Sequence, residues 1–163
     1  MLYLGEQDLD TVFAYVADRY GRQEEVPHYR AHKEGVEKFL GVLQHVQSDT
    51  YYPTLLDKAT YLLVSVNKGH FFSNGNKRLA LVTMTTFLAI NDCDLQKIPK
   101  DEYRELLKKL FPEYPECMDF EQFSSTDFAT YNLSIIIADS GTYSITFDAL
   151  KERVRAFLAE ALA

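Results

Sequence analysis

The stretch G-H-F-F-S-N-G-N-K-R, residues 69–78, gathers the side chains best suited to chemistry in this chain. His70 is its only histidine, and a short polar turn separates it from the cations Lys77 and Arg78. An apolar segment that predicts a helix follows at once, so the turn directs backbone N–H groups and two positive charges at one volume before a helix N-terminus. Such a volume binds phosphate. The sequence therefore predicts a phosphate site with a base beside it.

Composition narrows the kinds of protein that this chain can be. With 163 residues, of which 47% are hydrophobic, we expect a single globular domain over 1–163 that folds without disulfide or metal. A net charge of −7 disfavours nucleic acid and anionic membranes as partners. No apolar run is long enough to cross a bilayer. With no secretory signal and two widely spaced cysteines, Cys93 and Cys117, we expect a cytoplasmic protein.

Apolar residues recur at helical spacing along most of the chain, which predicts an all-α protein with six or seven helices. The residues expected at helix ends are Asp8, Gly21, Thr54, Gly69, Thr126 or Asp127, and Thr146. The helix expected from Asn76 to about Ile90 is apolar nearly all round. A helix of that kind belongs at the centre of a bundle, so the residues before it would be mounted on the core.

Two segments do not follow the helical pattern. Residues 22–33 contain Pro27 and no apolar period, and they predict a loop. Residues 47–53, Q-S-D-T-Y-Y-P, favour strand geometry at Thr50, Tyr51 and Tyr52, so we expect a short extended flap or β-hairpin there.

The order His-x-Phe-x-x-Gly-Asn-Lys-Arg resembles the Fic/Doc family signature, H-x-F-x-(D/E)-G-N-(G/K)-R. The matching positions are His70, Phe72, Asn74, Gly75, Asn76, Lys77 and Arg78. The resemblance is closest to the Doc (death-on-curing) toxin branch, and it extends to residues 19–21, 59–62 and 138–158. Residues 96–125 have no counterpart there and look like a helical insertion.

The resemblance implies an all-α Fic/Doc-like bundle around the central helix. It also implies transfer of part of a nucleotide triphosphate to a hydroxyl side chain of a protein. Fic members mostly transfer AMP, whereas Doc-type members resemble a kinase that phosphorylates elongation factor Tu and stops translation. Lys77 at the Gly/Lys position favours the Doc branch, as does Leu81 where adenylylating members carry a second arginine. ATP would be the co-substrate and the protein the toxin of a toxin–antitoxin pair. We find no inhibitory S/T-x-x-x-E-G/N motif, so a separate antitoxin is expected.

The resemblance also assigns roles that are chemically reasonable. His70 would take the proton of the attacking hydroxyl, since an imidazole with a pKa of about 6.5 suits that task at neutral pH. Gly75, Asn76, Lys77 and Arg78 would hold the phosphates. The flap at 47–53 would align the target segment by strand-like pairing.

One position departs from the signature. Asn74 stands where the family has the acid that holds Mg²⁺, and an amide brings no charge to a cation that prefers carboxylates. Two alternatives to a Doc-like kinase therefore stay open: an AMP transferase of the Fic type, and a catalytically degenerate Fic-like binding protein. Asn74 also precedes Gly75, a pair prone to deamidation, so ageing to aspartate is a further hypothesis.

Overall fold

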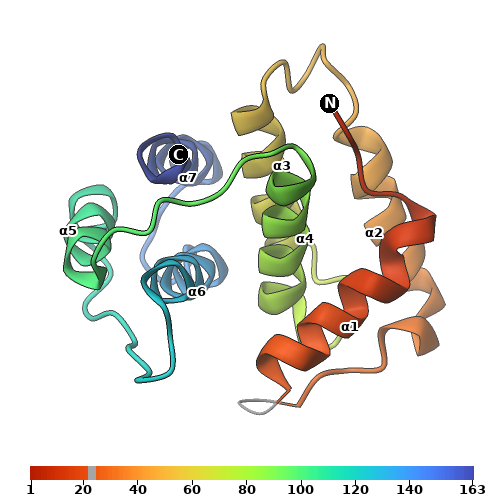
Figure 1. Ribbon diagram of the computed structural model, residues 1–163, viewed down its shortest axis with the longest axis horizontal. Helices are drawn as coiled ribbons and strands as arrows, with labels where there is room; N and C mark the ends of the chain where they lie inside the picture. The colour runs from red at the N-terminus through yellow and green to blue at the C-terminus, as the bar shows by residue number, and fades with distance from the viewer. Residues whose placement is uncertain (22–24) are drawn as a thin grey trace.

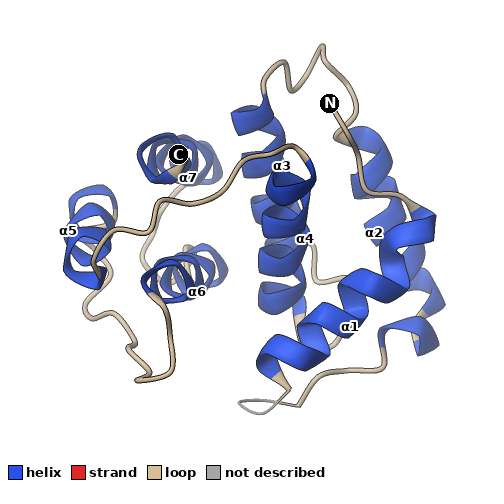
Figure 2. Ribbon diagram, viewed as in Figure 1, coloured by secondary structure: helices blue, strands red, loops and turns tan. Residues whose placement is uncertain are grey.

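The computed structural model describes residues 1–21 and 25–163, which form an all-α bundle with no β-strand in that part of the chain (Figures 1 and 2). The helices are α1 Leu9–Tyr20, α2 Lys33–His45, α3 Leu55–Lys68, α4 Asn76–Ile90, α5 Lys100–Leu110, α6 Ser125–Ala138 and α7 Phe147–Ala161, with short 3-10 helices η1 Glu6–Asp8 and η2 Tyr29–Ala31. The all-α prediction is confirmed. Within the described residues, none of these helices combines the length and apolar character needed to cross a bilayer.

The helix ends follow the capping residues read from the sequence, with one exception. Thr54 and Thr146 each accept a hydrogen bond from a backbone amide in the first turn of their own helices, at 3.1 and 3.2 Å. The exception is α6, for which the predicted caps, Thr126 and Asp127, are wrong. Ser124 caps this helix, because its backbone is extended and its hydroxyl accepts from the Asp127 amide at 3.1 Å.

Helix α4 lies in the middle of the bundle and packs against α1, α3 and α6 (Figure 1). Its residues from Leu79 to Met84 are all buried, as the apolar pattern predicts, and Arg78 before them is buried as well. The one hydroxyl among them, that of Thr83, donates to the Leu79 carbonyl at 2.7 Å and so is satisfied within the helix. The segment that leads into α4 is therefore mounted on the most enclosed helix of the fold.

The C-terminal end of α3 is fastened to α6. The Asn67 amide donates to the Ser134 carbonyl at 2.9 Å. Lys68 Nζ donates to the Ser140 hydroxyl at 2.8 Å and to the Ile137 carbonyl at 3.3 Å, which satisfies a carbonyl at the end of α6. These contacts fix the point at which the chain leaves α3 and enters residues 69–78.

The connection between α2 and α3 forms turns, so the expected extended flap or hairpin is wrong (Figure 2). The Tyr52 amide donates to the Ser48 carbonyl at 3.0 Å, which curls the segment. From α3, the fully buried Lys58 ammonium donates to the Val46 carbonyl at 2.9 Å. Because a buried cation needs oxygen partners, it draws carbonyls inward from a segment that would otherwise extend.

Helix α5 and the coil after it pack against α6 and α7 (Figure 1). The Arg104 guanidinium lies 4.8 Å from the centre of the Phe128 ring, and the side chain of Tyr103 is fully buried. The segment 96–125 is thus packed as part of the bundle. That it is an insertion relative to the family stays a prediction.

Candidate active site

The loop between α3 and α4 carries His70 in an exposed position and in the left-handed region, with φ +50°. Gly69 ends α3 as expected, but with a helical backbone, φ −71° and ψ −20°, in place of the left-handed one typical of a terminal glycine. Space explains this glycine: a Cβ there would lie 2.4 Å from the Phe71 ring and 2.7 Å from the Ser65 carbonyl oxygen. The reversal of the chain consequently falls on His70.

A left-handed backbone costs a non-glycine residue about 1–2 kcal/mol, although histidine tolerates it better than most. Strain of this kind persists only where the surroundings hold the residue. Here the loop is held on both sides, by the anchored end of α3 and by the start of α4. The result is an imidazole that projects from a fixed backbone and is open to solvent.

Asn76 braces the loop from the first position of α4. Its Nδ2 donates to the Phe72 carbonyl at 2.7 Å, and its Oδ1 accepts from the Phe72 amide at 3.1 Å. Phe72 itself is buried and anchors the loop in the core. Both ends of the Asn76 amide are thus engaged within the protein, so its first role is to close the loop.

Tyr29 is a contributor to the loop that sequence reasoning missed. Its buried hydroxyl donates to the Gly75 carbonyl at 2.9 Å, and burial raises the pKa of this phenol far above its ordinary value, which keeps it a donor. Gly75 is left-handed, with φ +74°, and a Cβ there would lie 2.6 Å from the Tyr29 oxygen and 2.8 Å from Pro27 Cδ. The space beside Gly75 is therefore filled by the protein's own side chains.

An aromatic stack ties this tyrosine to the core and to the loop. The Tyr29 ring lies 4.7 Å from that of Phe13 on α1 and 4.9 Å, edge to face, from that of Phe72. The exposed His32 adds a ring 6.2 Å from Phe72. No local sequence pattern predicted this arrangement, because its members lie far apart in the sequence.

Of the predicted loop 22–33, residues 22–24 lie outside the described residues. The remainder flanks the stretch around His70.

The two cations of the stretch have different surroundings. Lys77 is partly exposed and forms no ion pair with any other described residue, so its ammonium is available to an anion. Arg78 is only 4% exposed and lies near the phenols of Tyr20 and Tyr131. Burial lowers the pKa of the Arg78 guanidinium, and the two phenols oppose that shift. The positive charge of Arg78 thus acts from within the low-dielectric core, where electrostatic effects are strong.

Replacing Gly75 by alanine should destabilise the fold and loosen the loop. We expect a loss of about 1–2 kcal/mol from the left-handed backbone alone, with more from the contacts with Tyr29 and Pro27. Urea unfolding measures the change. Gly141 has open space where a Cβ would lie, so Gly141→Ala is the control and should change stability by less than about 0.5 kcal/mol. Equal effects at the two glycines would contradict the packing role of Gly75.

The residues at this loop do not fit a resident Mg²⁺ ion. Asn74 is exposed and offers a neutral amide, and the oxygen of Asn76 is engaged with the Phe72 amide. Among residues 1–21 and 25–163, no cluster of three His, Cys, Asp or Glu side chains is placed to hold a metal ion. No other described cluster therefore compensates for the weak Mg²⁺ binding expected from Asn74.

The structure does not bring Thr50, Tyr51 and Tyr52 to the loop. They precede α3, whereas His70 follows it, and a helix of 14 residues is about 21 Å long. Figure 1 shows the connection between α2 and α3 at the top of the view, at the far end of α3. The rings of Tyr52 and Tyr61 stack there at 4.2 Å, with His45 against them. That these three residues align a target segment stays a prediction.

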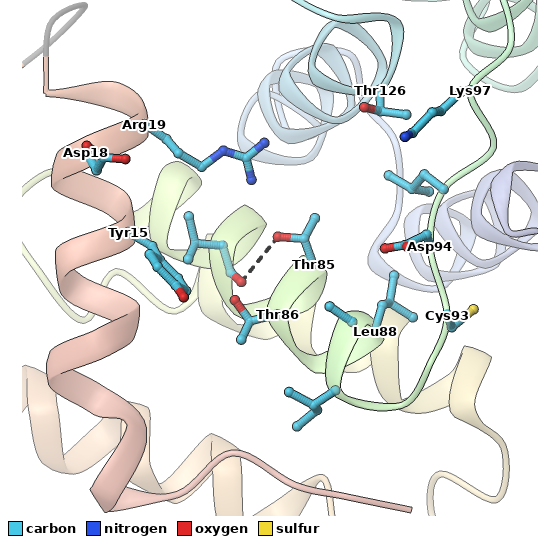
Figure 3. Close-up of a pocket in the computed structure, with 14 residues that line it drawn as sticks. Tyr15, Asp18, Arg19, Thr85, Thr86, Leu88, Cys93, Asp94, Lys97 and Thr126 are labelled. Atoms are coloured by element: carbon cyan, nitrogen blue, oxygen red, sulfur yellow. Dashed lines mark hydrogen bonds between the residues drawn. The ribbon is translucent and has the colours of Figure 1, made fainter.

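A cavity of about 750 Å³ lies further along α4, between α1 and the chain segment that follows α4 (Figure 3). Its lining carries Arg19, Lys97, Asp18 and Asp94, and no residue from 69–78 contributes to it. Arg19 is bound to Asp127 at 2.7 Å. Because charges of both signs face this cavity, it does not by itself suit a triphosphate, and the phosphate site predicted at the start of α4 stays a prediction.

Comparison with known proteins identifies the family. A model of the Fic/DOC family matches residues 3–88, which is more than half of the chain and includes the whole stretch from His70 to Arg78. The protein belongs to the Fic/DOC family. Neither the curated proteins nor the solved structures gave a match. The matched region ends before 96–125 and 138–158, so it bears on neither the expected insertion nor the resemblance to Doc in those segments.

Proposed function

We propose that this protein transfers the γ-phosphate of ATP to a hydroxyl side chain of a cytosolic protein, as a Doc-like toxin. Membership in the Fic/DOC family indicates a transferase of AMP or phosphate. One observation carries the proposed transfer: an exposed His70 on a fixed, left-handed backbone lies in the loop that leads to the accessible Lys77 at the N-terminus of α4. A base and an anion site are thus built into one rigid element.

The chain's own residues suffice to describe the transfer. The acceptor hydroxyl oxygen attacks the γ-phosphorus, and His70 takes the hydroxyl proton as the new O–P bond forms. The bond between the γ-phosphorus and the bridging oxygen breaks, and ADP leaves. Lys77 and backbone N–H groups at the N-terminus of α4 stabilise the charge on the phosphate oxygens, with Arg78 adding positive charge from the core. Phosphoryl transfer asks the protein mainly for such positioning and electrostatics.

Leu81 favours phosphate transfer over AMP transfer. It stands where adenylylating members carry a second arginine, and its side chain is only 1% exposed. A nucleotide cannot reach this side chain, and no cation occupies the position. AMP transfer, in which the hydroxyl attacks the α-phosphorus and pyrophosphate leaves, remains the second candidate because Lys77 would serve either phosphate.

Transfer of label from ATP separates the three candidate functions. The purified protein is incubated with a bacterial lysate and, in parallel, with purified elongation factor Tu, using ATP labelled at either the γ- or the α-phosphorus. We expect protein labelling from the γ-label only. Labelling from the α-label would replace phosphate transfer by AMP transfer. No labelling from either would favour the degenerate binding protein, which the neutral Asn74 already suggests.

Elongation factor Tu and an antitoxin are proposed as partners on the family resemblance. Elongation factor Tu is the first target to test, because the Doc-type members that this sequence resembles act on it. An antitoxin binding near His70 would inhibit labelling in trans. Co-expression with the gene adjacent to that of this protein, followed by pull-down, tests that part of the proposal; a chain that is non-toxic when expressed alone would contradict it.

A further inference from the structure

Asn74 differs from the other asparagines of this protein. The sequence has five, at 67, 74, 76, 91 and 132. Four of them donate from Nδ2 to a backbone carbonyl at 2.7 to 2.9 Å: Asn67 to Ser134, Asn76 to Phe72, Asn91 to Phe87, and Asn132 to Phe128. Asn74 is exposed, and its side chain forms no hydrogen bond with the described residues. Its amide is free to turn toward its own backbone.

The residue after Asn74 also suits an intramolecular reaction. Asn74–Gly75 is the only Asn-Gly pair in the sequence, and glycine has no Cβ to obstruct attack by its nitrogen. The Gly75 amide donates no hydrogen bond to any described residue. The nitrogen that would react is therefore not engaged by the rest of the fold, although the Gly75 carbonyl is held by Tyr29.

We propose that Asn74 is a deamidation site and that its aspartate product gives the family motif the carboxylate it lacks. The Gly75 nitrogen attacks Asn74 Cγ and loses its proton to water. The bond from Cγ to Nδ2 breaks, the departing nitrogen takes a proton from water and leaves as ammonia, and a five-membered succinimide forms. One water then opens this ring. Cleavage at Cγ restores the ordinary backbone with an aspartate at position 74, whereas cleavage at the main-chain carbonyl gives isoaspartate.

The consequence for activity rests on the proposed function. An aspartate at 74 would add a charged oxygen donor at the position where the family holds its metal ion, and Mg²⁺ prefers such donors to amides. The newly made chain would bind magnesium-bound nucleotide weakly, and the aged chain would bind it more tightly. The deamidation itself requires neither nucleotide nor catalysis.

The fold restrains this reaction through Gly75. Succinimide formation needs rotation about the Asn74–Gly75 backbone, and the Tyr29 hydroxyl and the Pro27 ring hold that glycine in place. We expect the folded protein to deamidate more slowly than the free peptide G-H-F-F-S-N-G-N-K. Tyr29→Phe removes the hydrogen bond and keeps the ring, so it should raise the rate in the folded protein toward that of the peptide.

Mass spectrometry tests the modification directly. Folded protein is aged at mildly alkaline pH and cut with trypsin after Lys68 and Lys77, which releases both Asn74 and Asn76 in one peptide. We expect the mass gain of amide-to-acid conversion to accumulate at Asn74 and to be absent at Asn76, whose amide is bonded at both ends. Asn74→Gln should abolish the gain. Equal conversion at both positions, or none at Asn74, would overturn the proposal.

A binding measurement tests the consequence separately. Asn74→Asp should bind a fluorescent ATP analogue roughly tenfold more tightly than the fresh wild-type chain in the presence of Mg²⁺, and about equally without it. The affinity of aged wild-type protein should approach that of the variant in proportion to its aspartate content. Chromatography separates aspartate from isoaspartate and so measures that content. Unchanged affinity, or a product that is isoaspartate alone, would overturn the role of the carboxylate. If the mass and affinity results are as expected but no label is transferred, the proposed function fails and this inference stands.

Discussion

His70→Asn will lower the rate of γ-phosphate transfer by about 100- to 10,000-fold and leave the stability of the protein nearly unchanged. The loss follows from removal of the base that accepts the hydroxyl proton. Asparagine is chosen because it tolerates the left-handed backbone that His70 adopts, with φ +50°, so the loop geometry is kept. The initial rate of label transfer measures the first effect, and urea unfolding measures the second.

Two further variants serve as controls for this result. His45→Asn changes a histidine that packs against the aromatic rings of Tyr52 and Tyr61, remote from the loop, and it should retain the wild-type rate. His70→Gly relieves the strained backbone, so we expect its free energy of unfolding to equal or exceed that of the wild type while transfer is lost. A His70→Asn protein that folds normally and transfers phosphate at the wild-type rate would remove His70 from the catalytic role.

Lys58→Met will destabilise the protein by about 3 kcal/mol, the largest effect that we expect from a single change on stability. The Lys58 side chain is fully buried, and its ammonium lies 2.9 Å from Asp49 Oδ1 and donates to the carbonyls of Val46 and Ser48 at 2.9 and 3.4 Å. Methionine fills similar space but leaves both carbonyls without this donor, and the contact with the Val46 carbonyl is buried. Urea unfolding with a common slope for both proteins gives the difference.

The matched control is Lys38→Met. Lys38 pairs with Glu34 on the exposed face of α2 at 2.9 Å, and such pairs contribute only about 0.3–0.5 kcal/mol. Asp49→Asn should have an effect between those of Lys58→Met and Lys38→Met, because it removes the counter-charge of the buried ammonium while the backbone carbonyls still accept from it. If Lys58→Met lowered the free energy of unfolding no more than Lys38→Met, the buried cation would not be what holds the α2–α3 connection in turns.

The helices were predictable because their signals are local. Thr54 and Thr146 cap the helices they were expected to cap, and the apolar run from Leu79 to Ile90 forms the central helix. The flap at 47–53 was not predictable in the same way. Thr50, Tyr51 and Tyr52 favour strand geometry, but Lys58 in the next helix draws the carbonyls around them inward. A side-chain contact from another element therefore outweighed the local preference.

In the site, too, the sequence indicated the roles of some residues, and only the structure shows the roles of others. His70 and Lys77 lie where their side chains are accessible, which suits the roles inferred from the family signature. Asn76 and Gly75 have structural tasks that the signature does not reveal, since Asn76 closes the loop and Gly75 makes room for Tyr29. Arg78 is buried, which no composition or spacing argument indicated.

The sequence by itself determined the all-α class, the central helix and the family signature, because residue type and short spacing suffice for each of these. Membership in the Fic/DOC family rests on the same local information. Only the tertiary structure decided which side chains around the loop face a ligand and which hold the loop in place. Tyr29 lies 46 residues from the Gly75 carbonyl it binds, and a contact of that separation depends on how the helices pack and not on any local pattern.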